Sequence, residues 1–117
     1  MLIICFIITA LLPYLLCGIN SAIIVTKIKS GDDIRTLGSG NAGLTNTLRT
    51  QGKLAALFVL LGDVAKGVLS VVFVGLSFRL LADIDPWSAG SEYEWALYAS
   101  GASAILGHVF PVYYGFK

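Results

Sequence analysis

Three long apolar segments, at residues 2–28, 54–78 and 95–114, limit what this chain can fold into. Each reaches the roughly 20 residues that a helix needs to cross a bilayer. Charged residues make up only 13% of the 117 residues, against about 25% in ordinary soluble domains. A soluble domain of this size would lack the polar surface to cover itself. We therefore predict a single all-α, polytopic membrane domain, residues 1–117, with three transmembrane helices.

The charges of the two connecting segments predict the orientation of these helices. Cytoplasmic loops carry an excess of Lys and Arg. The second connection, residues 79–94, has only Arg79, whereas five cations lie in and beside the first, residues 29–53: Lys27, Lys29, Arg35, Arg49 and Lys53. We expect a cell-membrane protein with the first loop in the cytoplasm and the N-terminus outside. Because no Lys or Arg precedes Lys27, a retained span is favoured over a cleaved signal peptide.

Composition argues against several other classes of protein. Cys5 and Cys17 lie in one apolar segment, and in a continuous helix they would be about 18 Å apart, too far for a disulfide. A single histidine and the lack of a Cys/His cluster give no sign of a metal site, and we expect no cofactor. No basic run is present, so no nucleic-acid partner is expected.

The polar stretch TLGSGNAGLTNTLRT, residues 36–50, interrupts this apolar chain. Its glycines Gly38, Gly40 and Gly43 spell G-x-G-x-x-G, the fingerprint of dinucleotide-binding folds. That fingerprint requires a preceding strand and a βαβ unit, and the residues around it here do not favour one. A phosphate-binding P-loop is also excluded, because no Gly-Lys-Ser/Thr follows at the required spacing.

The chemistry of this stretch nevertheless suits an anion. Glycines allow backbone N–H groups to converge on an oxyanion, and a helix that starts near Thr45 or Asn46 would add its N-terminus. Arg49 offers a planar, permanently charged fork that suits phosphate. Further neutral donors come from the side chains of Ser39, Asn41, Thr45 and Asn46. The alternative interpretation is a flexible cytoplasmic loop with a helix cap.

Ionisable residues within the apolar segments are the other candidates. Asp63 and Lys66 are three residues apart and share a helical face, so we expect a structural intramembrane ion pair rather than a catalytic one. His108 lies near the predicted cytoplasmic end of the third span. Lys117 is interpreted either as a phosphate cation or as a snorkelling anchor at the membrane surface.

Three ordered stretches carry a family likeness: SGNAGLTNTLR (39–49), DVAKG (63–67) and GHVFPVYYGFK (107–117). Together they resemble the bacterial acyl-phosphate:glycerol-3-phosphate acyltransferases, integral membrane enzymes of phospholipid synthesis. The likeness spans essentially the whole chain. Members of the family are longer and have further membrane spans, so the sequence resembles their N-terminal portion.

The resemblance implies acyl transfer from acyl phosphate to the sn-1 hydroxyl of glycerol 3-phosphate, giving lysophosphatidic acid and phosphate. Both substrates would meet the enzyme at the bilayer, and no cofactor or metal is implied. The implied catalytic residues are Ser39, Arg49 and His108, and the implied substrate-binding residues are Gly38, Gly40, Asn41, Gly43, Thr45, Asn46 and Lys117. Two alternatives remain: a small transporter or channel subunit, and an inactive truncated fragment.

Overall fold

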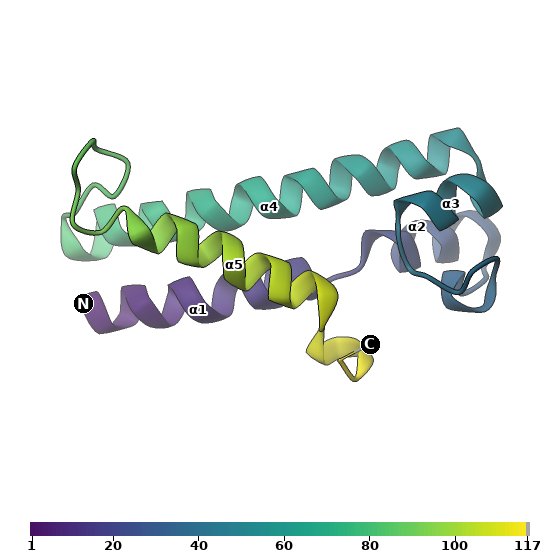
Figure 1. Ribbon diagram of the computed structural model, residues 1–117, viewed down its shortest axis with the longest axis horizontal. Coiled ribbons are helices and arrows are strands. Elements are labelled where there is room, and N and C mark those ends of the chain that lie inside the picture. Colours follow the sequence, from purple (N-terminus) through teal and green to yellow (C-terminus); the bar gives the residue numbers. More distant parts are fainter. Residues whose placement is uncertain (117) are drawn as a thin grey trace. The chain divides into compact units, whose positions relative to one another are not determined.

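The computed structural model describes residues 1–116, and its regular elements in that range are all helical (Figure 1). This confirms the predicted all-α class. Two short 3-10 helices, η1 (Ile34–Thr36) and η2 (Val112–Tyr114), accompany the α-helices. The α-helices are α1 (Leu2–Gly18), α2 (Ser21–Ser30), α3 (Leu44–Gln51), α4 (Lys53–Ala82) and α5 (Trp95–Val109).

The chain divides into two compact units. The α1/α5 unit comprises Met1–Ile19 and Lys66–Lys117, of which Lys117 is outside the described residues. The loop unit comprises Asn20–Ala65 and contains the glycine-rich stretch. The two units share α4, which passes from the loop unit to the α1/α5 unit between Ala65 and Lys66.

Two segments, Leu2–Ser30 and Lys53–Ala82, are long and apolar enough by length and composition to cross a membrane. They correspond to the first two predicted spans. The third predicted span, residues 95–114, contains α5, which has 15 residues and is about 22 Å long. The hydrocarbon core of a bilayer is about 30 Å thick. The third span and the orientation of the N-terminus therefore stay predictions.

The first apolar segment differs from the single helix that we expected over residues 2–28. Helix α1 ends at Gly18, Ile19 and Asn20 are extended, and α2 begins at Ser21. The Asn20 side chain accepts a hydrogen bond from the N–H of Ile23 at 3.1 Å and so caps α2. Asparagine is among the best N-cap residues, and glycine favours helix ends. Hydropathy alone concealed this break because both sides of it are apolar.

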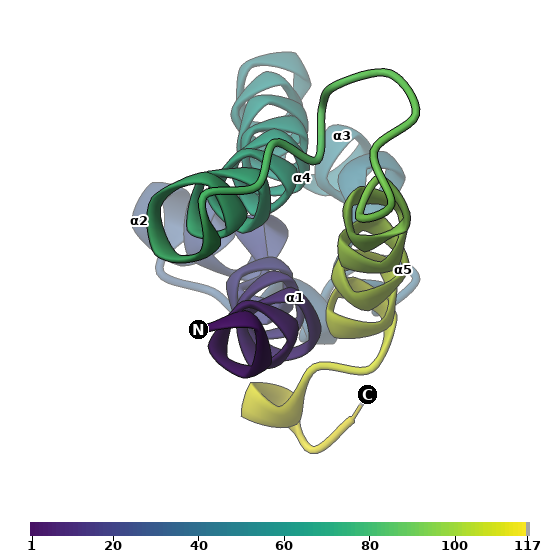
Figure 2. The same cartoon turned by 90° about the vertical axis from the view of Figure 1, so that its left-hand side faces the viewer.

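In the α1/α5 unit, α1 and α5 lie side by side (Figure 1; Figure 2). Glycine makes the close approach feasible. A Cβ atom added at Gly107 would lie 2.1 Å from the carbonyl oxygen of Tyr14, so the two backbones meet where a side chain would stand. Close backbone contact at small residues is typical of helices that pack in membranes.

The core of this unit joins α1, the second half of α4 and α5. Cys5, Val74, Phe78 and Ala96 are buried there. Polar side chains on these helices bond to nearby carbonyls, as Thr9 does to the carbonyl oxygen of Cys5 at 2.8 Å. Such bonds satisfy hydroxyls where water is scarce. Both cysteines are free and buried.

Aromatic rings gather where α1 begins and α5 begins. The ring of Phe6 lies 5.8 Å from Phe78, 6.5 Å from Tyr93 and 5.6 Å from Trp95, centroid to centroid. Contacts of this kind contribute about 0.5–1.5 kcal/mol each beyond the burial of area. Aromatic residues near the start of the third apolar segment therefore pack against protein as well as suiting a membrane interface.

The contact at Gly107 gives a direct test of α1–α5 packing. Gly107→Ala places a methyl group against the Tyr14 backbone and should destabilise the protein by about 1–3 kcal/mol through overpacking. Gly101→Ala on the same helix is the matched control, because no atom lies within 4 Å of its added Cβ. It should be neutral or stabilise by up to about 1 kcal/mol. Thermal unfolding in detergent would compare the two, and equal melting temperatures would contradict the packing described here.

Candidate functional site

The glycine-rich stretch is built on a small core inside the loop unit. Ile34, from η1, is fully buried with Ala22 of α2 and Val59 of α4, and Ala42 packs against this cluster. Burial of one Ile side chain contributes about 1.5–3 kcal/mol. The core therefore anchors the stretch at both ends, before its first glycine and just before α3.

A single side chain, Asn46, braces the stretch from within. Its Nδ2 donates to the carbonyl oxygens of Leu37 and Asn41, both at 2.9 Å, and more distantly to that of Ile34, at 3.5 Å. Its Oδ1 accepts from the N–H of Ser39 at 3.2 Å. Asn46 is only 2% exposed. Both the oxygen and the nitrogen of its carboxamide thus bond to the loop backbone and hold the loop in shape.

The first glycine of the stretch is required by this brace. Gly38 has φ +53°, which only glycine adopts without strain. A Cβ atom there would lie 2.3 Å from Asn46 Oδ1 and 2.8 Å from Thr50 Cγ2. Gly40 also has a positive φ, +76°. Conformation and space inside the loop thus account for these two glycines independently of any ligand.

Helix α3 begins at Leu44, close to the start expected near Thr45 or Asn46. Gly43 is its N-cap residue and provides no side-chain cap, so the first N–H groups of the helix lack an intrahelical partner. Thr45 and Arg49 are exposed and one turn apart, and therefore share a face. The start of α3 therefore presents backbone donors, and one face of the helix presents the Thr45 hydroxyl and, from the last turn, the Arg49 guanidinium.

The charges around the loop differ in how they are used. Arg35 forms a salt bridge with Asp33, 2.7 Å between Nη2 and Oδ2. The side-chain hydrogen bond from Arg35 is the main cause that lowers the pKa of Asp33 from 3.8 to about 2. The pair is therefore ionised at neutral pH. The side chain of Arg49, in contrast, makes no hydrogen bond or ion pair with any residue among 1–116, so its charge is available to a ligand.

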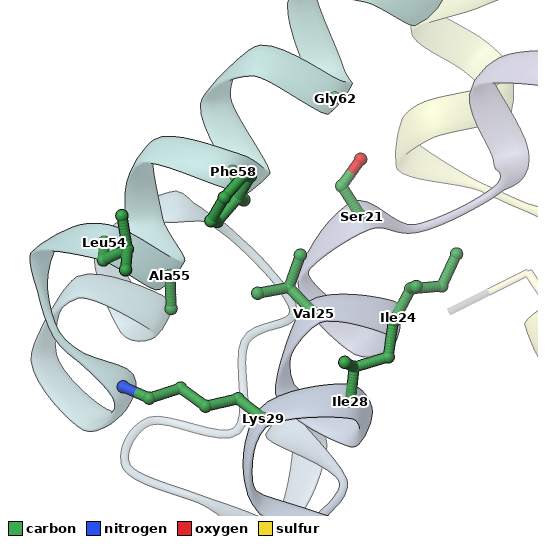
Figure 3. Close-up of a pocket in the computed structure, with 9 residues that line it drawn as sticks. All are labelled: Ser21, Ile24, Val25, Ile28, Lys29, Leu54, Ala55, Phe58 and Gly62. Carbon is green, nitrogen blue, oxygen red and sulfur yellow. The ribbon is translucent and has the colours of Figure 1, made fainter.

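An apolar groove lies beside this site, between α2 and the first turns of α4 (Figure 3). Its volume is about 570 Å³, within the roughly 300–1,000 Å³ typical of small-molecule sites. Lys29 supplies the one charged side chain of its lining, and its Nζ bonds to the carbonyl oxygen of Gln51 at the C-terminus of α3. The lining residues are Ser21, Ile24, Val25, Ile28, Lys29, Leu54, Ala55, Phe58 and Gly62.

The structure brings together only part of the predicted site. Seven of the predicted residues lie in the loop unit with Arg49: Gly38, Ser39, Gly40, Asn41, Gly43, Thr45 and Asn46. His108 lies in the α1/α5 unit, exposed in the last turn of α5, and forms no hydrogen bond within residues 1–116. Lys117 lies outside the described residues. The catalytic and binding roles stay predictions.

The intramembrane lysine has partners that the sequence did not suggest. Lys66 is 9% exposed, and its Nζ donates to the carbonyl oxygens of Cys17 at 3.3 Å and Ile19 at 2.6 Å. These carbonyls belong to the C-terminal end of α1, where the helix dipole favours a cation. Asp63 is half-buried in the loop unit, and its predicted pairing with Lys66 stays a prediction.

Comparisons with known proteins place this architecture in a family. The sequence profile described as "Glycerol-3-phosphate acyltransferase" matches residues 7–117. The chain belongs to this family. Glycerol-3-phosphate acyltransferases of Coxiella burnetii and Clostridioides difficile strain 630 are 42% and 44% identical to it over 115 and 112 residues. In both cases the match covers 96% of this chain and 51% of the relative.

A solved structure supports the same assignment. The crystal structure of PlsY (YgiH), an integral membrane glycerol 3-phosphate acyltransferase in its glycerol 3-phosphate form, has a TM-score of 0.70 and 32% sequence identity. The match covers 96% of this chain and 50% of that one. The acyltransferase resemblance and the helical membrane class are therefore confirmed. The chain spans about half the length of the curated relatives that it matches.

Sequence reasoning missed two residues that shape this acyltransferase-family loop. Asn20 ties α2 to the loop through a bond from Nδ2 to the carbonyl oxygen of Ala42, 3.1 Å long. Lys29 holds the far end of α3. The N-cap pattern Asn-Ser-Ala identifies Asn20 as a helix start, but its second bond links residues 22 positions apart and has no local signal. From the sequence, Lys29 was counted only as one of the cations of the predicted cytoplasmic loop.

The bracing of the loop predicts how its glycines respond to substitution. Gly38→Ala should open the loop, because the new methyl group meets both the strained φ and the Asn46 carboxamide. Gly31→Ala is the matched control, with a similar φ of +77° but no atom within 4 Å. The control should lose only the roughly 1–2 kcal/mol of a left-handed alanine. Hydrogen exchange at residues 37–46 should accelerate much more in Gly38→Ala. Equal exchange in the two variants would contradict the brace.

Proposed function

We propose that the protein transfers an acyl group from acyl phosphate to the sn-1 hydroxyl of glycerol 3-phosphate. The observation that carries the proposal is the donor set of the loop unit: the Arg49 side chain has no partner among residues 1–116, and the N-terminus of the same helix, α3, is uncapped. Membership in the glycerol-3-phosphate acyltransferase family supports the choice of acceptor. The acyl phosphate donor comes from the motif resemblance alone.

The chemistry asks mainly for positioning and charge stabilisation. The hydroxyl oxygen of glycerol 3-phosphate forms a bond to the acyl carbon, and the bond from that carbon to the phosphate oxygen breaks. The hydroxyl proton passes to a base, and inorganic phosphate leaves. Acyl phosphate is a mixed anhydride with a good leaving group, so no covalent enzyme intermediate is required. Fixed donors at the phosphate oxygens supply the main stabilisation.

The roles proposed within the loop unit follow from the exposure of each side chain. Arg49 binds phosphate oxygens in a fork, and Thr45 and the N-terminus of α3 bind on the same face. Ser39 and Asn41 are exposed on the loop and add neutral donors. Because the Asn46 carboxamide already holds the loop backbone, Asn46 acts by positioning these groups. The motif likeness alone assigns His108 to polarising the reacting groups or accepting the proton, and Lys117 to binding phosphate as a further cation.

The groove between α2 and α4 suits the acyl chain of the donor. Its walls are mostly aliphatic and aromatic, and it holds one cation, Lys29. An amphiphile with a long chain and an anionic head matches that distribution of polarity. The proposed location is the cell membrane, with the glycine-rich loop at the cytoplasmic face, where both phosphates are accessible from water.

Arg49→Lys tests whether the Arg49 guanidinium binds phosphate in a bidentate manner. Lysine keeps the charge but loses bidentate geometry, so lysophosphatidic acid formation should fall by about 10²-fold or more. The assay uses membranes that contain the protein expressed from its full reading frame, with acyl phosphate and radiolabelled glycerol 3-phosphate. Arg35→Lys is the matched control, because Arg35 is engaged by Asp33 and should keep nearly full activity. Undiminished turnover in Arg49→Lys would remove Arg49 from the mechanism.

Ile24→Trp tests the groove. Ile24 lines the groove and is 42% exposed, so the larger ring should narrow the space for a chain without disturbing the buried core. We expect turnover of long-chain acyl phosphates to fall about tenfold relative to short-chain ones, as for other pocket-narrowing changes. Leu60→Trp, at 44% exposure on α4 and outside the groove, should leave this ratio unchanged. An unchanged ratio in Ile24→Trp would place the acyl chain elsewhere.

A further inference from the structure

We infer that Asn20 is a positioning residue that sets the direction of the phosphate-binding backbone from outside the loop. The inference rests on the proposed function for its catalytic consequence, but not for its structural one. Asn20 lies 18 or more positions before every loop residue that the motif likeness names. Its position at the break between α1 and α2 gives it access to both α2 and the loop.

Asn20 uses both halves of one carboxamide. Oδ1 accepts from the N–H of Ile23 and caps α2, and Nδ2 donates to the carbonyl oxygen of Ala42, each at 3.1 Å. Among short side chains, only an amide offers a separate donor and acceptor at this reach. Aspartate keeps the acceptor and loses the donor. Asn20 therefore ties the start of α2 to the loop in a way that a simple cap residue cannot.

The carbonyl that Asn20 holds decides where the next N–H points. Ala42 precedes Gly43, the N-cap residue of α3, and the peptide between them is planar and trans. In a trans peptide the N–H points away from the C=O. A carbonyl held toward Asn20 therefore turns the Gly43 N–H away from Asn20, and this N–H directly precedes the uncapped N–H groups that begin α3.

Glycine neighbours make this restraint necessary. Gly43 has no side chain to limit its rotation, and the Asn46 brace ends at the carbonyl of Asn41. The Ala42–Gly43 peptide thus lies just beyond that brace. Ala42 packs on the core of the loop unit, which fixes its position, while the bond from Asn20 fixes the rotation of the peptide plane.

The residue before Asn20 is held as well. The Ile19 carbonyl oxygen accepts from Lys66 Nζ at 2.6 Å, a bond within the α1/α5 unit. Both extended residues between α1 and α2 are therefore held by hydrogen bonds. Ile19 is held through its carbonyl oxygen, and Asn20 is held through its side chain. This bond gives Lys66 a structural role that does not depend on Asp63.

Asn20→Asp is the decisive variant, because it is almost isosteric, keeps the cap on Ile23 and replaces the donor with an oxygen facing the Ala42 carbonyl. Two measurements are made on the full-length protein in detergent. Without substrate, hydrogen exchange at the amide of Thr47, which bonds to the Gly43 carbonyl oxygen at 3.0 Å, should accelerate about tenfold, while exchange in α2 stays as in the wild type. With substrates, KM for glycerol 3-phosphate should rise about tenfold, as for one lost hydrogen bond, while kcat changes less than twofold.

Asn20→Ser and Asn20→Ala complete the comparison. Serine retains a cap but does not reach Ala42, so it should reproduce the exchange and KM changes even if the aspartate variant is poorly folded. Alanine loses both bonds and should also accelerate exchange in α2. If the Asp and Ser variants exchange at the wild-type rate at Thr47, the positioning role is overturned. If exchange accelerates but the wild type shows no acyl transfer, the positioning stands and the proposed function fails.

Discussion

The buried carboxamide of Asn46 is the interaction on which the geometry of the glycine-rich loop depends. It satisfies the N–H of Ser39 and the carbonyls of Leu37 and Asn41 at once. A buried backbone group without a partner costs about 1–3 kcal/mol, so a loop of this shape needs such a brace. The need for glycine at position 38 follows from it, because a side chain there would occupy the space of Asn46 Oδ1. The exposed donors are then free for a ligand.

Polar groups on the apolar helices also form hydrogen bonds within the protein. Hydroxyls and a thiol bond within and between helices, as between Cys17 Sγ and Ser70 Oγ at 3.4 Å. The ammonium of Lys66 bonds to carbonyls at the end of α1. In a bilayer, water cannot satisfy these groups. A helix break at Ile19–Asn20 is therefore tolerated where a lysine and an asparagine bond to the backbone on either side of it.

Much of the fold was predictable because its signals are local. Segment length and hydropathy predicted an all-helical membrane chain, and the polar stretch with Arg49 was identified from composition. The break after Gly18 was missed, since hydropathy averages over it, although glycine followed by an asparagine cap marks it. Asn46 was expected to bind substrate, and the structure shows its side chain engaged with the loop backbone. Asn20 and Ala42 could not be paired from the sequence, because no periodicity connects them.

The sequence by itself determined the chemistry available: which segments suit lipid, where anion-binding groups concentrate, and which family motifs they form. These depend on residue type and on spacing along one chain. Tertiary structure decided which polar groups form hydrogen bonds within the fold and which remain available to a ligand. That division depends on contacts between residues distant in sequence, such as the bond from Asn20 to Ala42. Asn41 and Asn46 carry the same side chain, yet one is exposed and the other holds the loop, because only Asn46 faces the backbone of the preceding turn.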